Sequence, residues 1–364
     1  MTSAHGVSPT ASARPVPKLV RSQPRNVAEV AGQVVAEMAR GLAVVPMLNG
    51  YCVLSRDRAE LARFGDPYRL VAGPDKLEPE LADTERHYQE LALKVMAGPV
   101  VGRFGTARFG VAFAAEPLAK EIVRRADGEI WFGVPEEETE PGKLADELGK
   151  LASIVVTGGT GGPGPTGVNF GVRPAVVDRR GKLAILDLER ELGELVRLGP
   201  GLFFSVLVVC TGNSCRSPMA SSALAEMLEG IPAFVYSAGT NAPVGGPATT
   251  MAVQVMREVG LDLTRHRAQQ MGPEMIEAAD LILVMEEYHR ERVVELVPDV
   301  AGRTRLLLSF VGRDDEVGDP IGTSVDVYRR ALEQMRPALE LVAREVRQRA
   351  GSSRTESQES RIRS

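Results

Sequence analysis

The sequence predicts an α/β protein in which a separate α/β domain precedes a doubly wound parallel sheet. Two observations predict this class. Beyond residue 202, short apolar strands alternate with amphipathic helices, the pattern of a parallel sheet with crossover helices. The strand that ends at Cys210 runs through a short loop into a helix, and such loops lie at the carboxyl edge of a parallel sheet. The 364 residues are enough for two domains with their own cores.

The first half mixes helices and strands. Valines at helical spacing predict a helix over residues 26–40, which Gly41 ends. Further helices are predicted at residues 84–96 and 118–126, and strands at 42–45, 99–104, 109–114, 129–134, 151–157, 175–178 and 183–186. A glycine-rich run at 158–165 lacks the Gly-Lys-Ser/Thr ending of a phosphate cradle and contains prolines, so we interpret it as a loop.

The second half supplies the alternating elements. Strands are predicted at residues 203–209, 234–237, 280–285 and 305–308, and helices at 218–228, 248–259, 275–278, 286–296 and 325–350. The predicted domains therefore span residues 26–200 and 202–350. Residues 1–25 and 351–364 have the composition of disordered tails, with prolines in the first and serines and arginines in the second.

Composition excludes several classes of protein. Hydrophobic residues at 44% and charged residues at 25% are ordinary for a globular protein, and a net charge of −5 argues against a general DNA or membrane partner. No apolar stretch reaches the roughly 18–20 residues of a membrane span. Three cysteines make no disulfide framework, so a reducing, cytoplasmic setting is expected.

Cys210 ends an apolar strand, and Arg216 follows after five intervening residues at the start of a predicted helix. Backbone N–H groups at a helix N-terminus bind a tetrahedral oxyanion, and the helix dipole favours its charge. The guanidinium of Arg216 suits two oxygens of a phosphate. These groups are expected to lower the pKa of Cys210 from its usual value of about 8.5, so that it attacks as a thiolate. The pattern indicates a cysteine-dependent phosphatase loop.

A cysteine and an arginine at this spacing are weak evidence alone, because such a match arises by chance. The alternative is a buried strand cysteine and an unrelated surface arginine. The context favours the phosphatase loop, because Ser217 suits the N-cap of the next helix and Pro218 its first position.

Four separated motifs share the order and spacing of one known family. They are Cys210-Thr211-Gly212-Asn213-Ser214-Cys215-Arg216-Ser217, Ser237-Ala238-Gly239-Thr240, His266-Arg267-Ala268-Gln269-Gln270 and Gly318-Asp319-Pro320. On these motifs, residues 202–350 resemble the low-molecular-weight protein-tyrosine-phosphatase family, which includes bacterial protein-arginine phosphatases. The resemblance implies that family's fold, a phosphorylated protein as substrate, and neither a metal nor a cofactor.

The resemblance also implies roles for individual residues. Cys210 attacks phosphorus and forms a phosphocysteine, while Arg216 and the amides of the loop hold the phosphoryl oxygens. Asp319 protonates the leaving group and then deprotonates the attacking water. By itself, an Asp-Pro pair would be interpreted as a turn. The loop residues Thr211, Gly212, Asn213, Ser214 and Cys215, together with Ser217, Ser237 and His266, form the phosphate-binding and supporting set.

Three of these assignments leave alternatives open. His266 alone also fits a purely structural histidine. Cys215 is either a partner for a reversible disulfide with Cys210, as in the family, or a small buried residue that fills the loop. His289 is expected to be a surface residue. Arsenate reductases share the fold but need further cysteines, and none follows Cys215, so we exclude that activity.

Substrate preference is predicted from Ser214. Tyrosine-directed relatives carry a bulky aliphatic residue at this position, whereas arginine-directed relatives carry a threonine. A hydroxyl suits a polar guanidinium better than a phenyl ring. Ile321-Gly322, after the Asp-Pro pair, supply no aromatic wall for a tyrosine ring. Phosphoarginine is therefore the predicted substrate, with phosphotyrosine as the alternative.

Residues 26–200 faintly resemble the threonylcarbamoyl-adenylate synthase (YrdC-like) domain. The similarity lies in residues 41–46, Ala97-Gly98-Pro99 and residues 154–157 before the glycine-rich loop. That family's Lys-x-Arg nucleotide clamp is missing, and its Pro-Thr-Glu-Thr turn is here Pro46-Met47-Leu48-Asn49. Because a triphosphate would lose its charge partners, we expect a degenerate domain and no RNA or nucleotide binding. The competing hypothesis is a ligand- or RNA-binding protein in which the phosphatase is ancillary.

Overall fold

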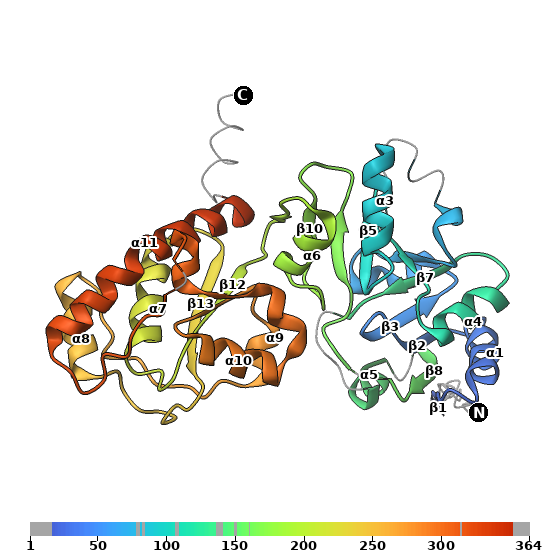
Figure 1. Ribbon diagram of the computed structural model, residues 1–364. Coiled ribbons are helices and arrows are strands. Elements are labelled where there is room, and N and C mark those ends of the chain that lie inside the picture. The colour runs from blue at the N-terminus through green and yellow to red at the C-terminus, as the bar shows by residue number, and fades with distance from the viewer. Residues whose placement is uncertain are drawn as a thin grey trace, which may run out of the picture. The chain divides into compact units, whose positions relative to one another are not determined.

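The computed structural model describes residues 17–77, 81, 84–105, 109–135, 141–148, 151–159, 161–313 and 315–351. The α/β class predicted from the sequence is confirmed (Figure 1). The chain divides into two compact units, Met1–Thr166 and Gly167–Ser364. This division falls earlier than the boundary near residue 201 that the sequence predicts.

The first unit is a mixed parallel and antiparallel sheet with helices packed on it. Its strands follow the order β1-β8-β2-β3-β7-β4-β6-β5. Their bounds are β1 (Lys18–Arg21), β2 (Leu42–Met47), β3 (Gly50–Ser55), β4 (Tyr68–Val71), β5 (Val100–Arg103), β6 (Val111–Phe113), β7 (Ile130–Gly133) and β8 (Ala152–Thr157). The helices are α1 (Val27–Glu37), α3 (Arg86–Val95), α4 (Pro117–Arg125) and α5 (Pro141–Leu148), with the 3₁₀ turns η1 (Arg58–Phe64) and η2 (Pro74–Lys76).

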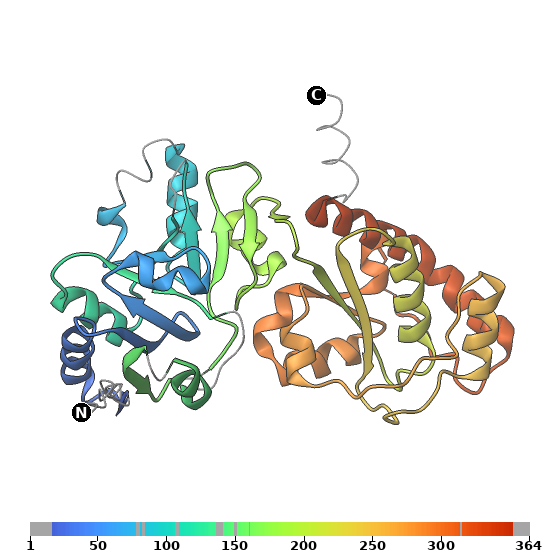
Figure 2. The same cartoon turned by 180° about the vertical axis from the view of Figure 1, so that it is seen from behind.

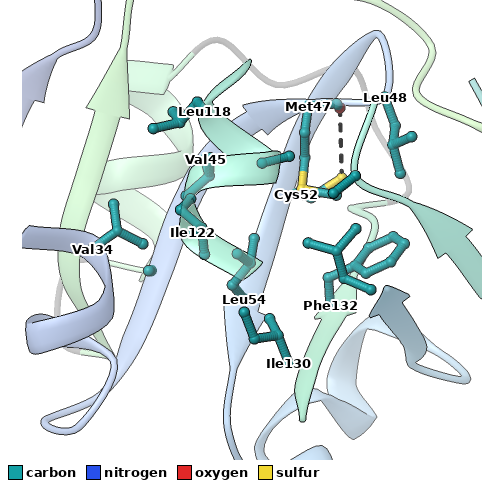
Figure 3. Packing of buried hydrophobic residues seen from close by; sticks show 14 of the residues in the cluster. Val34, Val45, Met47, Leu48, Cys52, Leu54, Leu118, Ile122, Ile130 and Phe132 are labelled. Carbon is teal, nitrogen blue, oxygen red and sulfur yellow. Dashed lines mark hydrogen bonds between the residues drawn. The ribbon is translucent and has the colours of Figure 1, made fainter. Parts of the chain in front are cut away.

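Apolar side chains cover both faces of this sheet. On one face, Val34 of α1 and Ile122 of α4 pack against Val45, Leu54 and other strand residues (Figure 3). On the other face, η1 and α5 contribute a second buried cluster around Val53 and Trp131. Cys52 lies in the first cluster, with its Sγ 3.7 Å from the carbonyl oxygen of Met47. This cysteine therefore has an ordinary place in a hydrophobic core.

Two predictions about the first 200 residues need correction. Lys18–Arg21, which the sequence assigns to a disordered tail, form β1 and pair in parallel with β8. The predicted strand at 183–186 falls on a helix, α6 (Ile185–Leu192), because Ile185, Leu188 and Leu192 share one buried face at helical spacing. Short apolar runs do not separate strand from helix by pattern alone. The remaining parts of the predicted tails, 1–16 and 352–364, lie outside the described residues.

The second unit contains the predicted doubly wound sheet. Its four strands are all parallel and follow the order β13-β12-β14-β15. They are β12 (Phe204–Cys210), β13 (Ala233–Gly239), β14 (Leu281–Val284) and β15 (Thr304–Leu306). The helical elements between and after them are α7 (Arg216–Met227), α8 (Thr250–Glu258), α9 (Pro273–Glu277), α10 (Glu287–Leu296), η3 (Pro298–Arg303), η4 (Leu307–Val311) and α11 (Val325–Ala350).

Helices cover both faces of this four-stranded sheet, as the view from behind shows (Figure 2). Successive side chains of β12 point to opposite faces of the sheet. Leu207 and Val209 join a cluster with Ile276 of α9 and Val293 of α10, while α7 and α11 pack on the opposite face. Strand order reverses at β12, so its carboxyl end is the switch point where ligands bind in sheets of this kind.

Residues 167–200 belong to the second unit, where ion pairs connect them to the residues after 201. They include β9 (Thr166–Asn169), β10 (Val176–Arg179), α6 and β11 (Arg197–Leu198). Arg180 donates two hydrogen bonds, of 2.7 and 2.6 Å, to the carboxylate of Asp280. Glu189 pairs with Arg349 of α11 at 2.8 Å, and Asp187 pairs with Arg303. These long-range contacts account for the early division of the chain.

Among the helices that the structure describes, none combines the length and apolar character needed to cross a bilayer.

Candidate active site

The strand, loop and helix predicted around Cys210 are present. Cys210 is the last residue of β12, residues 211–215 form the loop, and α7 begins at Arg216. The expected N-cap differs, because Cys215 takes that position and makes no side-chain cap bond. Ser217 instead turns its hydroxyl toward the loop, where it lies 2.9 Å from Cys210 Sγ.

Neighbouring segments hold the loop by its carbonyl oxygens. Thr240 N donates to Cys210 O, Asn241 N to Thr211 O and Thr249 N to Ser214 O, each at 2.9 Å. Gly239 allows this close approach, since a Cβ there would lie 2.4 Å from Thr211 O. The loop is therefore fixed by backbone contacts before any ligand binds.

Asn213 organises the interior of the loop. It is buried and adopts a positive φ of 48°, a conformation that asparagine tolerates better than most residues. Its Nδ2 donates to Ser217 Oγ and to Ser237 Oγ, both at 2.9 Å, and its Oδ1 accepts from Gln269 N at 2.8 Å. His266 Nε2 donates to the Asn213 carbonyl at 2.7 Å. The structure thus brings Asn213, Ser217, Ser237 and His266 together.

The Cys210 thiol is buried and polar contacts surround it. Burial raises the pKa of Cys210, which is opposite to the sequence-based expectation. The Ser217 hydroxyl, the charge of Arg216 and the backbone N–H groups of Ser217 and Asn213 oppose this effect. The expectation fails because it omits the cost of desolvating a thiolate, and because carboxylates already pair with the Arg216 guanidinium.

Arg216 is buried at the start of α7 and contacts groups from distant parts of the chain. Its Nη1 donates to Glu286 Oε1 and, at 2.8 Å, to the carbonyl of Val317. Its Nη2 lies 2.9 Å from Asp319 Oδ2. Asp319 therefore reaches the same guanidinium that the loop presents, although its own side chain is 38% exposed. These contacts bring Cys210, Arg216 and Asp319 into one site.

Glu286 and His289 are missed by the sequence analysis. Glu286 follows β14 and His289 lies one turn later on α10, so both project from the carboxyl end of the strand next to β12. Convergence of parallel strand ends is the signal that could have found them. The expectation that His289 is a surface residue is wrong, because its side chain is 0% exposed and its Nε2 lies 2.9 Å from Thr211 Oγ1.

The buried thiol of Cys215 contacts polar groups. Its Sγ lies 3.3 Å from the hydroxyl of Tyr328 and 3.5 Å from Thr249 Oγ1. Burial and the hydrogen bond to Cys215 raise the pKa of Tyr328 to about 12, so this hydroxyl keeps its proton at neutral pH. Cys210 and Cys215 are both free thiols here. A reversible disulfide between them stays a prediction.

Comparison with known proteins identifies the class of protein that has this fold and this loop. Residues 205–351 match the family described as low molecular weight phosphotyrosine protein phosphatase. A protein-arginine-phosphatase of Geobacillus stearothermophilus is 37% identical over 142 residues, covering 38% of this chain and 94% of the relative. A probable low molecular weight protein-tyrosine-phosphatase, EpsP, of Ralstonia nicotianae is 39% identical over 142 residues, covering 39% of this chain and 90% of the relative.

Among solved structures, a YwlE mutant from Bacillus subtilis is similar to this chain at 30% identity and a TM-score of 0.38, covering 40% of this chain and 99% of the other. The chain belongs to the low-molecular-weight protein phosphatase family through its second unit. It is therefore an enzyme of the protein phosphatase class, and the family predicted from the four sequence motifs is confirmed.

Proposed function

We propose that this enzyme is a cysteine-dependent phosphatase that works through a phosphocysteine intermediate and prefers phosphoarginine in proteins. In this proposal Cys210 is the nucleophile, Arg216 holds the phosphoryl group and Asp319 is the general acid and base. The observation that carries it is the meeting of these groups. The Cys210 thiol ends β12, Arg216 opens the next helix, and Asp319, which is distant in sequence, lies 2.9 Å from Arg216 Nη2.

The chemistry needs one carboxyl group in two protonation states. The Cys210 thiolate attacks phosphorus, the bond from phosphorus to the leaving nitrogen or oxygen breaks, and protonated Asp319 supplies the proton to that atom. Water then attacks the phosphocysteine, Asp319 takes the water's proton, and inorganic phosphate leaves the regenerated thiolate. A phosphoryl group that binds Arg216 Nη2 displaces the Asp319 carboxylate, which is then free to face the leaving group.

Several features support the stabilisation of the thiolate. Ser217 Oγ lies 2.9 Å from Cys210 Sγ, and Ser217 in turn accepts from Asn213 Nδ2. Because Asn213 supplies the donor, the Ser217 hydroxyl can direct its own proton to the sulfur at 2.9 Å, which is closer than its other acceptor, the Ala238 carbonyl at 3.5 Å. The bound phosphoryl group also draws Arg216 away from Asp319. These contacts favour the thiolate and oppose the burial that raises the pKa of Cys210.

The proposed preference for phosphoarginine is based on the side chains at Ser214 in the loop and at Ile321-Gly322. Ser214 is partly exposed, and Thr249 N anchors its backbone by donating to its carbonyl. A small hydroxyl at this position leaves room for a planar guanidinium and offers it a hydrogen bond. Ile321 is 58% exposed and Gly322 has no side chain, so neither stacks on a phenyl ring. Relatives named for arginine and for tyrosine are both similar to this chain.

The test is turnover of matched peptides that carry phosphoarginine or phosphotyrosine at one position. The wild-type enzyme is expected to have the higher kcat/KM on phosphoarginine. Ser214→Ile should lower that value and raise the value on phosphotyrosine, whereas Ser214→Thr, which keeps the hydroxyl, should retain the arginine preference. A wild-type enzyme that prefers the phosphotyrosine peptide would replace this proposal with a protein-tyrosine phosphatase.

A further inference from the structure

His289 is a fully buried polar residue to which the proposed chemistry gives no role. It lies on α10, and its Nε2 is 2.9 Å from the hydroxyl of Thr211, the first residue after Cys210. Its other ring nitrogen, Nδ1, is buried and has no hydrogen-bond partner among the residues that the structure describes. A buried polar ring that touches the phosphate loop through one atom requires an explanation.

The protonation state of the His289 ring decides how many N–H groups it can donate. Burial lowers the pKa of His289, which keeps the imidazole neutral near pH 7. Glu286, the N-cap residue of the same helix, opposes this effect, as do Asp319 and Glu316 from the loop before α11, whereas Arg216 of α7 reinforces it. A neutral ring has one N–H group.

The position of that proton follows from the partners of the two nitrogens. A proton on Nδ1 would leave a buried N–H group without an acceptor, an arrangement that is rarer in proteins than an unpaired acceptor. A proton on Nε2 is satisfied by Thr211 Oγ1. His289 therefore donates to the Thr211 hydroxyl oxygen.

The Thr211 hydroxyl has two lone pairs and one proton to place. One lone pair accepts from His289, and the other faces Arg216 Nη2 at 3.5 Å. The backbone of Thr211 is held by Asn241 N, which donates to its carbonyl at 2.9 Å. With both lone pairs directed at donors, the hydroxyl proton is left for a further acceptor, and the hydroxyl lies within 3.5 Å of the guanidinium proposed to hold the phosphoryl group.

We propose that His289 is a positioning residue that orients the Thr211 hydroxyl as an additional donor to the phosphoryl group in the loop. This inference rests on the proposed phosphatase site and adds a side-chain donor to those assigned above. His289 itself does not touch the substrate. It acts by occupying the lone pair that would otherwise let the hydroxyl rotate away from the bound oxyanion.

The test measures inorganic phosphate binding to the full-length protein by titration calorimetry, independently of turnover. Thr211→Val removes the hydroxyl at constant shape and should weaken phosphate binding by about 10- to 100-fold, the range for a hydrogen bond to a charged group. Thr211→Ser should restore most of that loss. Thr264→Val, at an exposed hydroxyl that bonds Asp262, is the matched control and should leave binding unchanged.

A double-mutant cycle separates positioning from simple packing. His289→Phe should weaken phosphate binding in the wild-type background but add little in the Thr211→Val background, and His289→Gln should recover part of the loss by supplying an N–H group. Equal losses in both backgrounds, or phosphate binding that is unaffected by Thr211→Val, would overturn the proposal. If His289→Phe does not fold, His289→Leu, which also lacks an N–H group, takes its place in the cycle.

The same titrations distinguish this inference from the proposed function. Phosphate binding that depends on Thr211 and His289 as described, in a protein without turnover on phosphopeptides, would sustain the inference and refute the catalytic proposal. Turnover that is normal in Thr211→Val, with phosphate binding unchanged, would refute the inference alone.

Discussion

The two ends of the four-stranded sheet bury charge in different ways. At the amino ends of its strands, Asp280 precedes β14 and is 1% exposed on its side chain, yet it accepts from Arg180, from Ile185 N and from Ser205 N. At the carboxyl ends, the Arg216 side chain is 2% exposed, but within the described part of the chain its Nε has no hydrogen-bond partner, and Asp319, one of its carboxylates, is 38% exposed. One end is closed by the protein's own groups, and the other is open to an anion.

This difference separates stability from function within one sheet. A buried charge whose partners are all supplied by the fold holds the chain together only while every partner remains. A buried arginine whose partner is an exposed carboxylate can exchange that partner for a phosphate. Variants at the carboxyl end should therefore change turnover more than stability, and variants at the amino end should do the reverse.

The largest expected effect is from Cys210→Ser. It should abolish turnover of para-nitrophenyl phosphate, because a serine alkoxide is far harder to form than a thiolate. The thermal midpoint should change little, since the replacement is close in shape. Cys52→Ala, in the core of the first unit, is the matched control and should retain turnover. Substantial activity in Cys210→Ser would remove this residue from the nucleophile role.

Asp319→Asn should have the next largest effect. Loss of a general acid typically slows the chemical step by about 10²- to 10⁴-fold. The loss should be smaller for an ester with a very good leaving group, which needs less protonation, so the measurement compares a series of aryl phosphates. Asp326→Asn, at an exposed carboxylate on α11, provides the control. An equal loss across the series contradicts the acid assignment.

Truncation tests where the catalytic unit begins. In chemical denaturation, a fragment of residues 167–364 should have a free energy of unfolding about 3–5 kcal/mol larger than one of residues 201–364, because the shorter fragment lacks the partners of Asp280, Arg303 and Arg349. Turnover of para-nitrophenyl phosphate by the longer fragment would show that the first unit is not needed for chemistry. Equal stability of the two fragments would return the boundary to residue 201.

Arg180→Met should have the smallest of these effects, and on stability alone. It leaves the buried Asp280 without its bidentate partner and should cost about 3 kcal/mol, while kcat of the folded protein stays unchanged. Arg329→Met breaks a pair with Glu258 in which both side chains are more than a third exposed and screened by water, so it should cost much less stability than Arg180→Met. Chemical denaturation of the two variants side by side decides the comparison. Matching losses in the two variants would mean that burial of Asp280 adds nothing to its pair.

Residues close together in the sequence were predicted well. An apolar strand, a cysteine at its end and an arginine at the next helix specify a loop whose parts are joined by the chain itself, so the positions of Cys210 and Arg216 follow from spacing. The prediction fails where a short segment depends on distant partners. Residues 185–192 form a helix whose Asp187 and Glu189 pair with Arg303 and Arg349, and no local pattern reveals those distant partners.

The sequence by itself determined the class of fold, the phosphatase family and the four motifs of the site, because each of these is written in local periodicity or in fixed spacings. Only the tertiary structure decided that Glu286 and His289 join the loop, that Tyr328 contacts Cys215, and that burial raises the pKa of Cys210. The physical reason is that strands from separate parts of the chain bring their carboxyl ends together. Desolvation and pairing then depend on neighbours that are far apart in sequence.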